Sequence, residues 1–188
     1  MASETASEDV EQLNAAEKIA LHLLGANNQN SVPGNIWLQK EFFLLSRHID
    51  DLQPYLGFEP HFQGPFSETV NNIKDNLEYL GFVERTRAGL QLTERGEQVE
   101  ETIRKGSSEE ILDLVEEIKD LLNDLSKDEL LVYIYYSYPD MTSESLEKDD
   151  LEPKRKSVAK KLYQRGKVDQ KKAAELSGHS VSEFEEAT

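Results

Sequence analysis

The stretch YLGFVERTRAGLQLTERG, at residues 79–96, decides the fold. Two short runs in which apolar and polar side chains alternate, residues 82–85 and 90–93, flank a turn at residues 87–89. Alternation around a glycine-containing turn predicts a β-hairpin, because successive side chains of a strand point to opposite faces. The pattern places Arg85 and Arg87 at or near the tip of this hairpin.

Helices are expected on both sides of the hairpin. Ser7, Ser67 and Thr93 are each placed to cap a helix, because a serine or threonine hydroxyl can accept a hydrogen bond from the first turn. Apolar spacing and caps together predict helices at residues 10–24, 36–48, 67–80 and 94–104. Three helices, a two-stranded wing and a closing helix are the element order of a winged helix, which we predict for residues 8–105.

Residues 106–138 are expected to form a helical extension. Ser107 and Glu110 have the spacing of a capping box, ahead of an apolar stripe from Ile111 to Leu125 that covers about two heptads. A stripe of this kind is buried either against the same chain or against a second copy in a homodimer.

The rest of the extension is also read as helix. Residues 130–136 are branched and aromatic, which fits a strand as well. Ser126 and Glu129 form a second capping box ahead of them, and this favours the helix.

The C-terminal part is predicted to be an acidic linker at residues 139–153, followed by a basic helix-turn-helix at residues 154–188. Ala174 suits the point where two helices touch, and Gly178 suits the turn between them. Ser180 can cap the second of these helices. The predicted fold class is therefore mainly α, with a winged helix, a helical middle segment and a C-terminal helix-turn-helix.

The net charge of −16 is unevenly divided. Residues 1–153 hold 12 basic and 32 acidic side chains, whereas residues 154–188 hold 9 basic and 5 acidic ones. This contrast predicts a basic tail that either has its own partner or docks on the acidic body. A salt-adapted acidic surface is the alternative, although 14 lysines against 7 arginines argue against it.

Composition also excludes several classes of protein. The chain has no cysteine, so disulfides, thiolate nucleophiles and cysteine-ligated metals are excluded. It begins without a basic segment followed by an apolar run, and its longest apolar stretch, residues 130–136, is too short to span a bilayer. We therefore expect a cytoplasmic protein without a membrane partner.

Two resemblances add to this interpretation. LQKEFFLL at residues 38–45, FEPHFQGPFSE at residues 58–68 and the stretch at residues 79–96 resemble the winged-helix regions of archaeal and bacterial regulators and of Panacea-type antitoxin-like proteins. That resemblance implies nucleic-acid binding or toxin neutralisation. Residues 154–188, with LYQRGK and KAAELSGHSVSEF, resemble a small uncharacterised archaeal and bacterial antitoxin-like family.

The candidate DNA contacts lie on the third helix, the wing and the basic tail. Asparagine can pair with adenine, and lysine and arginine can reach guanine or phosphate. The candidate residues are Asn71, Asn72, Lys74, Arg85, Arg87, Lys154, Arg155, Lys156, Lys160, Lys161, Lys171 and Lys172. Acids on the same helices oppose phosphate binding, and residues 1–105 hold 9 basic against 17 acidic side chains.

The expected function is a DNA-binding transcriptional regulator or antitoxin-like protein that forms a homodimer. The alternative is a non-enzymatic protein-protein interaction module, an acidic winged-helix scaffold that binds a basic partner such as a toxin. The phosphate-binding, dinucleotide-binding and nucleophile-elbow motifs are missing, and the four histidines lack metal-ligand spacing. We therefore expect no enzymatic activity, no cofactor and no metal.

Overall fold

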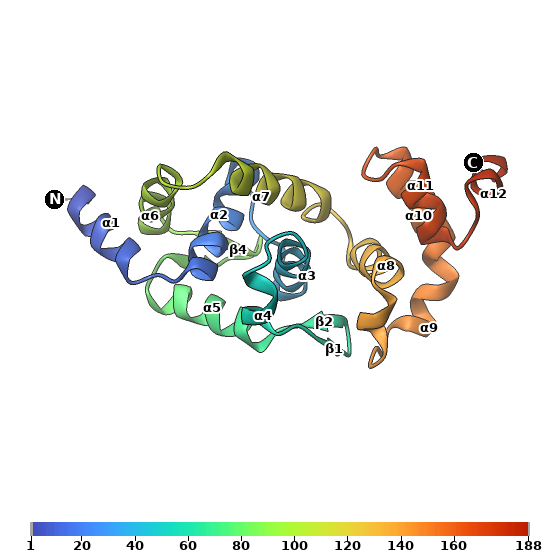
Figure 1. Cartoon of the computed structure of the whole chain (residues 1–188), viewed down its shortest axis with the longest axis horizontal. Helices are drawn as coiled ribbons and strands as arrows, with labels where there is room; N and C mark the ends of the chain where they lie inside the picture. Colours follow the sequence, from blue (N-terminus) through green and yellow to red (C-terminus); the bar gives the residue numbers. More distant parts are fainter. Residues whose placement is uncertain (1, 188) are drawn as a thin grey trace. The chain divides into compact units, whose positions relative to one another are not determined.

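A computed structural model describes residues 2–187 of the chain, with side chains from residue 6 onward. The described part is mainly helical, as predicted, with two small two-stranded sheets (Figure 1). The chain divides into two compact units. Unit 1 comprises residues 2–57 and 67–123, and unit 2 comprises residues 58–66 and 124–187.

Unit 1 contains seven elements of regular helix and one sheet. The helices are α1 (Ala2–Glu11), α2 (Ala15–Gln29), α3 (Asn35–Ser46), α4 (Leu52–Leu56), α5 (Glu68–Tyr79), α6 (Glu94–Arg104) and α7 (Glu109–Leu122). The sheet pairs β3 (Val83–Arg85) with β4 (Leu90–Leu92). Helix α2 packs against α5, α6, α7 and β4, and it therefore lies at the centre of the unit.

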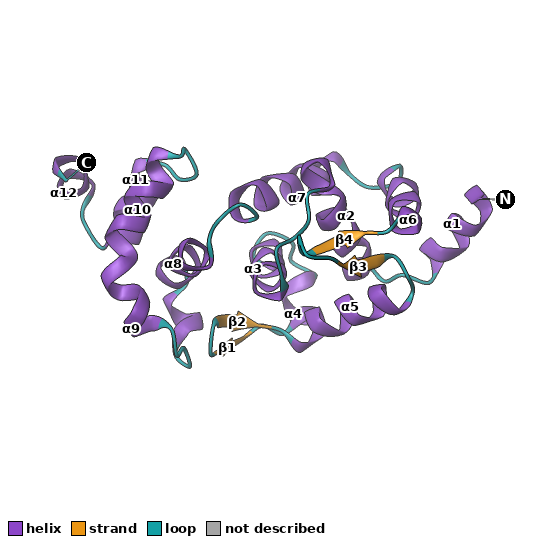
Figure 2. Ribbon diagram, turned by 180° about the vertical axis from the view of Figure 1, so that it is seen from behind, coloured by secondary structure: helices purple, strands orange, loops and turns teal. Residues whose placement is uncertain are grey.

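The predicted hairpin is confirmed. Strands β3 and β4 are antiparallel, with Val83 opposite Leu92 and Arg85 opposite Leu90 (Figure 2). Val32, which lies between α2 and α3, exchanges two backbone hydrogen bonds with Leu90, at N···O distances of 2.9 and 2.8 Å. This bridge fastens the hairpin to the segment that enters α3.

The single helix predicted for residues 10–24 is wrong, because the chain forms α1 and α2 there. Asn14 and Glu17 build a capping box in which each side chain accepts the other's backbone N–H at 2.9 Å. These reciprocal bonds satisfy donors that a helix start otherwise leaves free, so a new helix begins at Ala15. Ser7 lies inside α1 and does not cap it.

The apolar stripe of the middle segment is partly buried within unit 1, and Ile111, Leu114 and Leu121 stay half-exposed. Helix α7 packs on α2 and α3 and buries Val115, Ile118 and Leu122. The residue that caps α7 is Ser108, whose hydroxyl accepts from the Ile111 N–H, and not Ser107 as the capping-box spacing predicts. The Ser107 hydroxyl instead contacts the His22 imidazole and the Ile103 carbonyl.

Unit 2 is built from one hairpin and the C-terminal helices. The hairpin pairs β1 (Glu59–His61) with β2 (Gly64–Phe66). The helices are α8 (Lys127–Ser137), η1 (Pro139–Thr142), α9 (Lys148–Leu151), η2 (Glu152–Lys154), α10 (Arg155–Gln164), α11 (Gln170–Ser177) and α12 (Val181–Glu186). The helix predicted from the capping box at Ser126 and Glu129 is confirmed as α8.

The β1–β2 hairpin was not predicted, because its two prolines mark the segment as a loop. Pro60 lies opposite Pro65, and neither can donate to the ladder, so the pair occupies a position without hydrogen bonds. Gly64 has a φ of +80°, and a Cβ there would lie 2.8 Å from the Tyr135 ring. Glycine therefore permits both the turn and the packing of the hairpin on α8.

The two units differ in extent from the predicted segments. Residues 106–122 fold with unit 1, whereas α8 folds with the C-terminal helices. The predicted linker at residues 139–153 forms η1, α9 and part of η2, and it buries Thr142 and Leu151. Since Ser145 Oγ donates to the Tyr135 hydroxyl at 2.7 Å, the segment is anchored to α8.

The C-terminal helices form at the predicted positions. Gly178, with a φ of +76°, ends α11, and the Ser180–Glu183 capping box starts α12. Phe184 of α12 is buried and its ring lies 5.7 Å from that of Tyr163, edge to face. Helices α10 and α11 pack on α8.

Charged side chains are buried in the core of unit 1. Glu41 is fully buried and neither carboxylate oxygen has a hydrogen-bond partner among the described residues. Burial raises the pKa of Glu41 to about 8, and the positive charge of Lys119 opposes this rise. The folded state therefore holds a proton on Glu41 at pH values where the unfolded chain, at an ordinary value of 4.5, has lost it.

This protonation predicts a pH-dependent stability. Because the folded pKa of Glu41 is raised, its contribution is present below about pH 4.5 and is lost as the pH rises towards 8. Between pH 5 and 7 the free energy of unfolding is expected to fall by about 2 kcal/mol from this group alone. Glu41→Gln should remove that part of the slope in urea unfolding followed by Trp37 fluorescence. Equal slopes for the two proteins would contradict the assignment.

Candidate nucleic-acid interface

Helix α5 is held against α3 by a hydrogen-bonded junction around Gln39. The Gln39 side chain accepts from the Ser67 N–H and donates to the Ser67 carbonyl, both at 2.9 Å. The Ser67 hydroxyl caps α5 by accepting from the Val70 N–H at 3.2 Å. Gln39 is buried, and it therefore sets the position of α5 relative to α3. A lone glutamine on an apolar helix gave no signal of this role in the sequence.

The predicted α5 residues have different surroundings. The side-chain oxygen Oδ1 of Asn71 accepts from Asn35 Nδ2 at 3.0 Å and from Gln39 Nε2 at 3.1 Å, so Asn71 belongs to the junction. Asn72 is exposed. Lys74 is paired with Asp75 at 3.0 Å, and its side chain is only 12% exposed. Of the three, Asn72 is the one whose side chain is exposed and makes no hydrogen bond or ion pair among the described residues.

The outer face of α5 is not basic. Its exposed stripe consists of Glu68, Asn72, Asp75 and Tyr79 at helical spacing, and Tyr79 is 88% exposed. Two carboxylates on this stripe would face the phosphates of any nucleic acid laid along it. Helix α5 therefore offers an amide and a phenol for base contacts but no charge for phosphate contacts.

The wing carries the arginines that the sequence predicts. Arg85 lies 3.8 Å from Glu78 and remains 64% exposed. Arg87 is exposed and makes no hydrogen bond or ion pair with any described side chain. The turn between them is stiffened by Thr86, whose N–H and hydroxyl both donate to the Gly89 carbonyl.

Both arginines line a hollow at the start of α3. The hollow is bounded by Pro33, Gly34, Asn35, Arg85, Thr86, Arg87, Gly89 and Leu90. Gly34 occupies the N-cap of α3, so no side chain caps this helix. The first N–H groups of an uncapped helix and two guanidinium groups together favour an anion such as phosphate. The sequence shows the arginines, but only the fold brings them to the start of α3.

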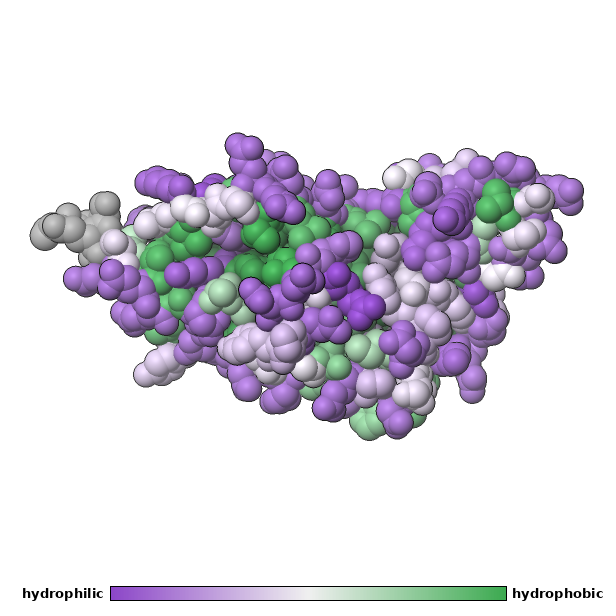
Figure 3. Space-filling view, viewed as in Figure 1, coloured by the Kyte–Doolittle hydropathy of each residue, from purple (hydrophilic) through white to green (hydrophobic). Residues whose placement is uncertain are grey.

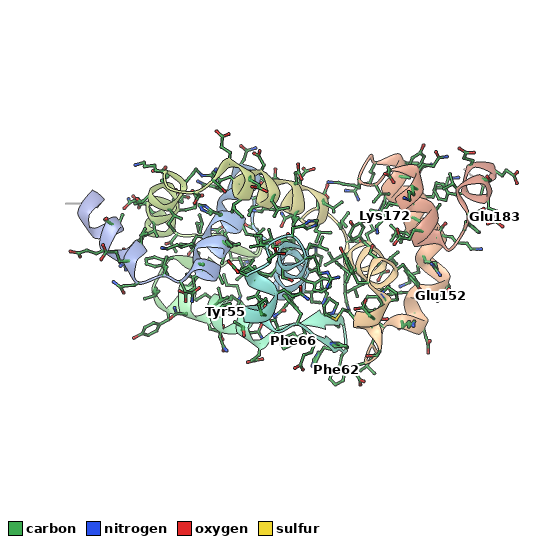
Figure 4. The ribbon with its side chains drawn as sticks, viewed as in Figure 1. Tyr55, Phe62, Phe66, Glu152, Lys172 and Glu183 are labelled. Atoms are coloured by element: carbon green, nitrogen blue, oxygen red, sulfur yellow. The ribbon has the colours of Figure 1, made fainter. Side chains whose placement is uncertain are left out.

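Most of the predicted basic residues of the C-terminal part form ion pairs within unit 2. Lys161 and Arg165 pair with Glu129, Arg165 and Lys167 with Asp124, Lys154 with Asp128, Arg155 with Glu152, and Lys172 with Glu175. Hydrophilic side chains cover most of the visible surface of α10 and α11 (Figure 3). Two members of these ion pairs, Lys172 on α11 and Glu152 at the start of η2, are labelled in Figure 4. The basic segment therefore docks on acids of its own unit.

The pKa values reflect this pairing. Burial opposes ionisation of Glu129, but the hydrogen bonds from Lys161 and from the Ser126 backbone, and the charges of Lys161 and Arg165, hold its pKa below the ordinary value. The hydrogen bond to Asp128 raises the pKa of Lys154. Arg155 also lies 3.7 Å from the centre of the Tyr136 ring and donates to two backbone carbonyls of α11.

Three predicted cations of unit 2 remain to be placed. Lys156 and Lys160 line a hollow with His179, Phe184 and three other residues of α10–α12, and Lys160 also contacts the Ala187 carbonyl. Lys156 and Lys171 make no hydrogen bond or ion pair with the described side chains. The fold therefore separates the predicted contacts into the wing group in unit 1 and a largely paired group in unit 2.

The described residues hold neither a cluster of metal-ligating side chains nor a helix that could span a membrane. Within residues 2–187, three or more histidine, aspartate or glutamate side chains nowhere gather as a metal site would require. Over the same residues, every helix is too short or too polar to cross a bilayer.

Comparison with known proteins adds no relative. No family model matches the sequence, and neither a curated protein nor a solved structure matches the chain.

Proposed function

We propose that residues 15–104 form a winged helix and that the protein is a DNA-binding regulator or antitoxin-like protein. In this proposal α3 and α5 are the helix pair, β3 and β4 are the wing, and Val32 supplies the short third strand that winged helices pair with their wing. The junction at Gln39 holds the second helix of the pair in place.

One observation carries the proposal. Arg87, which has no partner among the described side chains, and Arg85 line a hollow beside the uncapped start of α3. Two guanidinium groups beside a helix start that no side chain caps suit a backbone phosphate, and phosphate contacts supply most of the affinity of such proteins. With the phosphate held there, Asn72 of α5 is the exposed residue of the predicted set for base contacts.

The interface is placed on unit 1 because the cations of unit 2 are largely neutralised by neighbouring acids. Unit 1 holds 10 basic and 22 acidic residues in all, so its net charge of −12 opposes DNA at long range. We therefore expect binding that depends on the local hollow, with few phosphate contacts and a shallow dependence on salt.

Two double variants test the placement. Arg85→Ala/Arg87→Ala should weaken binding of a random-sequence duplex at low salt at least tenfold and reduce the salt slope by about 2, one for each lost phosphate contact. Lys156→Ala/Lys171→Ala removes two unpaired cations from unit 2 and serves as the matched control. Fluorescence anisotropy over a salt series measures both.

The outcomes separate the alternatives. A greater loss of affinity in the unit 2 variant would move the interface to the basic segment. Absence of binding by the unaltered protein at low salt would remove the regulator proposal. The second candidate, an acidic module that binds a basic partner such as a toxin, is favoured by the net charge of unit 1, and it predicts that a cationic peptide binds while duplex DNA does not. The homodimer stays a prediction.

A further inference from the structure

A serine, a histidine and a glutamate of unit 1 are linked in a single hydrogen-bonded chain. Ser107 Oγ lies 2.7 Å from His22 Nε2, and His22 Nδ1 lies 2.8 Å from Glu100 Oε1. Arg104 holds the same carboxylate oxygen at 2.8 and 2.9 Å. A hydroxyl next to an imidazole that a carboxylate orients is the arrangement that activates a serine for nucleophilic attack.

The charge of Glu100 decides how the histidine carries its proton. Burial opposes ionisation of Glu100, but hydrogen bonds from His22 and Arg104 outweigh it and hold the pKa of Glu100 below the ordinary value. An ionised carboxylate only accepts hydrogen bonds, so His22 Nδ1 must carry a proton. In the neutral imidazole Nε2 is then the free base, and it faces the Ser107 hydroxyl.

The Ser107 hydroxyl has a second acceptor as well. The Ile103 carbonyl lies 3.1 Å from Oγ, farther than His22 Nε2. When His22 is neutral, the shorter contact favours donation to the imidazole. When His22 is protonated it becomes the donor, and the hydroxyl proton turns to the carbonyl.

The three side chains of this hydrogen-bonded chain differ in burial. His22 and Glu100 are 2% and 6% exposed, so the hydrogen bond between them is shielded from bulk water. Ser107 is half-buried and is the most exposed residue of the three. It directly precedes α7, and the N–H groups of Ser108, Glu109 and Glu110 have no acceptor within that helix. Free N–H donors next to a nucleophile can stabilise a developing oxyanion.

We propose that Ser107, His22 and Glu100 form a nucleophile, base and orienting acid that cleave small esters by acyl transfer. Ser107 Oγ attacks the ester carbonyl while its proton moves to His22 Nε2. The tetrahedral adduct then collapses, the bond to the alcohol breaks, and the alcohol leaves with the proton from His22. His22 then takes a proton from water, whose oxygen attacks the carbonyl of the acyl-serine. The second tetrahedral adduct collapses, the bond to Ser107 Oγ breaks, and His22 returns its proton to Oγ as the carboxylic acid is released.

The surroundings restrict the substrate. Glu109 and Glu110, both exposed, occupy the first turn of α7 next to Ser107. Their negative charges disfavour an anionic acyl donor. The expected substrate is therefore a neutral or cationic ester.

Covalent labelling tests the nucleophile directly. The full-length protein, incubated with a neutral alkyl fluorophosphonate, should gain one adduct, which fragmentation of the tryptic peptide from Gly106 to Lys119 locates on Ser107. Ser107→Ala should lose the adduct. Ser7→Ala, which removes an exposed hydroxyl on α1 of the same unit, is the matched control and should retain it. An unlabelled Ser107 in the folded protein would overturn the proposal.

The role of His22 needs a separate readout. His22→Gln and Glu100→Gln should each slow labelling at least 100-fold while the far-UV circular dichroism stays unchanged. Because two separate variants are tested, the result can still be interpreted if one of them does not fold. Release of nitrophenol from p-nitrophenyl acetate should be lost in Ser107→Ala and retained in Ser7→Ala. Equal labelling rates in folded His22 and Glu100 variants, or equal hydrolysis by Ser107→Ala, would show that the chain is only structural and would overturn the proposal.

Discussion

Lys119→Met is expected to lower the free energy of unfolding of unit 1 by about 3–5 kcal/mol. The Lys119 side chain is fully buried, and its ammonium donates to the carbonyls of Leu24 and Ala26 at 3.1 and 2.9 Å. These carbonyls belong to the end of α2, where the backbone departs from helical φ and ψ at residues 26–28. Methionine fills similar space but leaves both carbonyls buried without a donor.

The same substitution also removes the positive charge that acts on Glu41. The charges of Glu41 and Glu116 favour the charged form of Lys119, although burial still lowers its pKa to about 8. Without Lys119, the buried Glu41 carboxylate has no compensating charge, and its protonated form is favoured further. The loss of stability should therefore grow above about pH 7, where Glu41 begins to ionise in the unaltered protein but not in the variant.

The measurement is urea unfolding followed by Trp37, the single tryptophan of the chain, which lies on α3 of unit 1. Lys105→Met, at an exposed position of the same unit, is the matched control and should change stability by less than about 0.5 kcal/mol. A loss as small in Lys119→Met as in the control would contradict the role given to the ammonium.

Gly89→Ala is expected to destabilise unit 1 by about 3 kcal/mol and to abolish the proposed binding hollow. Gly89 has a φ of +131°, which residues with a side chain rarely adopt. A Cβ would also lie 2.0 Å from the Val32 carbonyl, so the backbone has to move apart. That carbonyl accepts from the Leu90 N–H, and the bridge that fastens the wing would break.

Gly81→Ala provides the matched control for this effect. Gly81 has a φ of +76° but nothing within 4 Å of an added Cβ, so alanine there meets strain without a clash. It should cost about 1 kcal/mol and leave duplex binding unchanged. Urea unfolding and fluorescence anisotropy measure both variants, and equal losses of stability in the two would show that the Val32 contact does not constrain Gly89.

Local features could be read from the sequence because their partners lie within a few residues. The hairpin was predicted from alternation around Gly89, and α5, α6 and α8 from capping residues at Ser67, Thr93 and Ser126. One capping box was not predicted, at Asn14 and Glu17, where it divides a continuous apolar pattern into two helices. The choice between Ser107 and Ser108 as cap was also missed, by one residue.

The candidate sites depended on contacts between distant residues, which spacing does not show. Arg85 and Arg87 could be named in the sequence, but their place beside α3 follows from the bridge between Val32 and Leu90. For the basic tail the sequence left open a separate partner or docking on the acidic body, since its acidic partners at Asp124, Asp128 and Glu129 lie some 26 to 41 positions away. His22 and Ser107 are separated by 85 positions, and no motif connects them.

The sequence by itself determined the elements of regular structure around the wing, because caps, turns and alternation act over a few residues. It also determined the mainly helical class and the contrast in charge. Only the tertiary structure decided which cations stay unpaired, which hairpin joins the C-terminal helices, and that Ser107, His22 and Glu100 meet. The physical reason is that ion pairing, burial and hydrogen bonding between side chains depend on distance in space, whereas the wing at residues 79–96 depends on its neighbours in the chain.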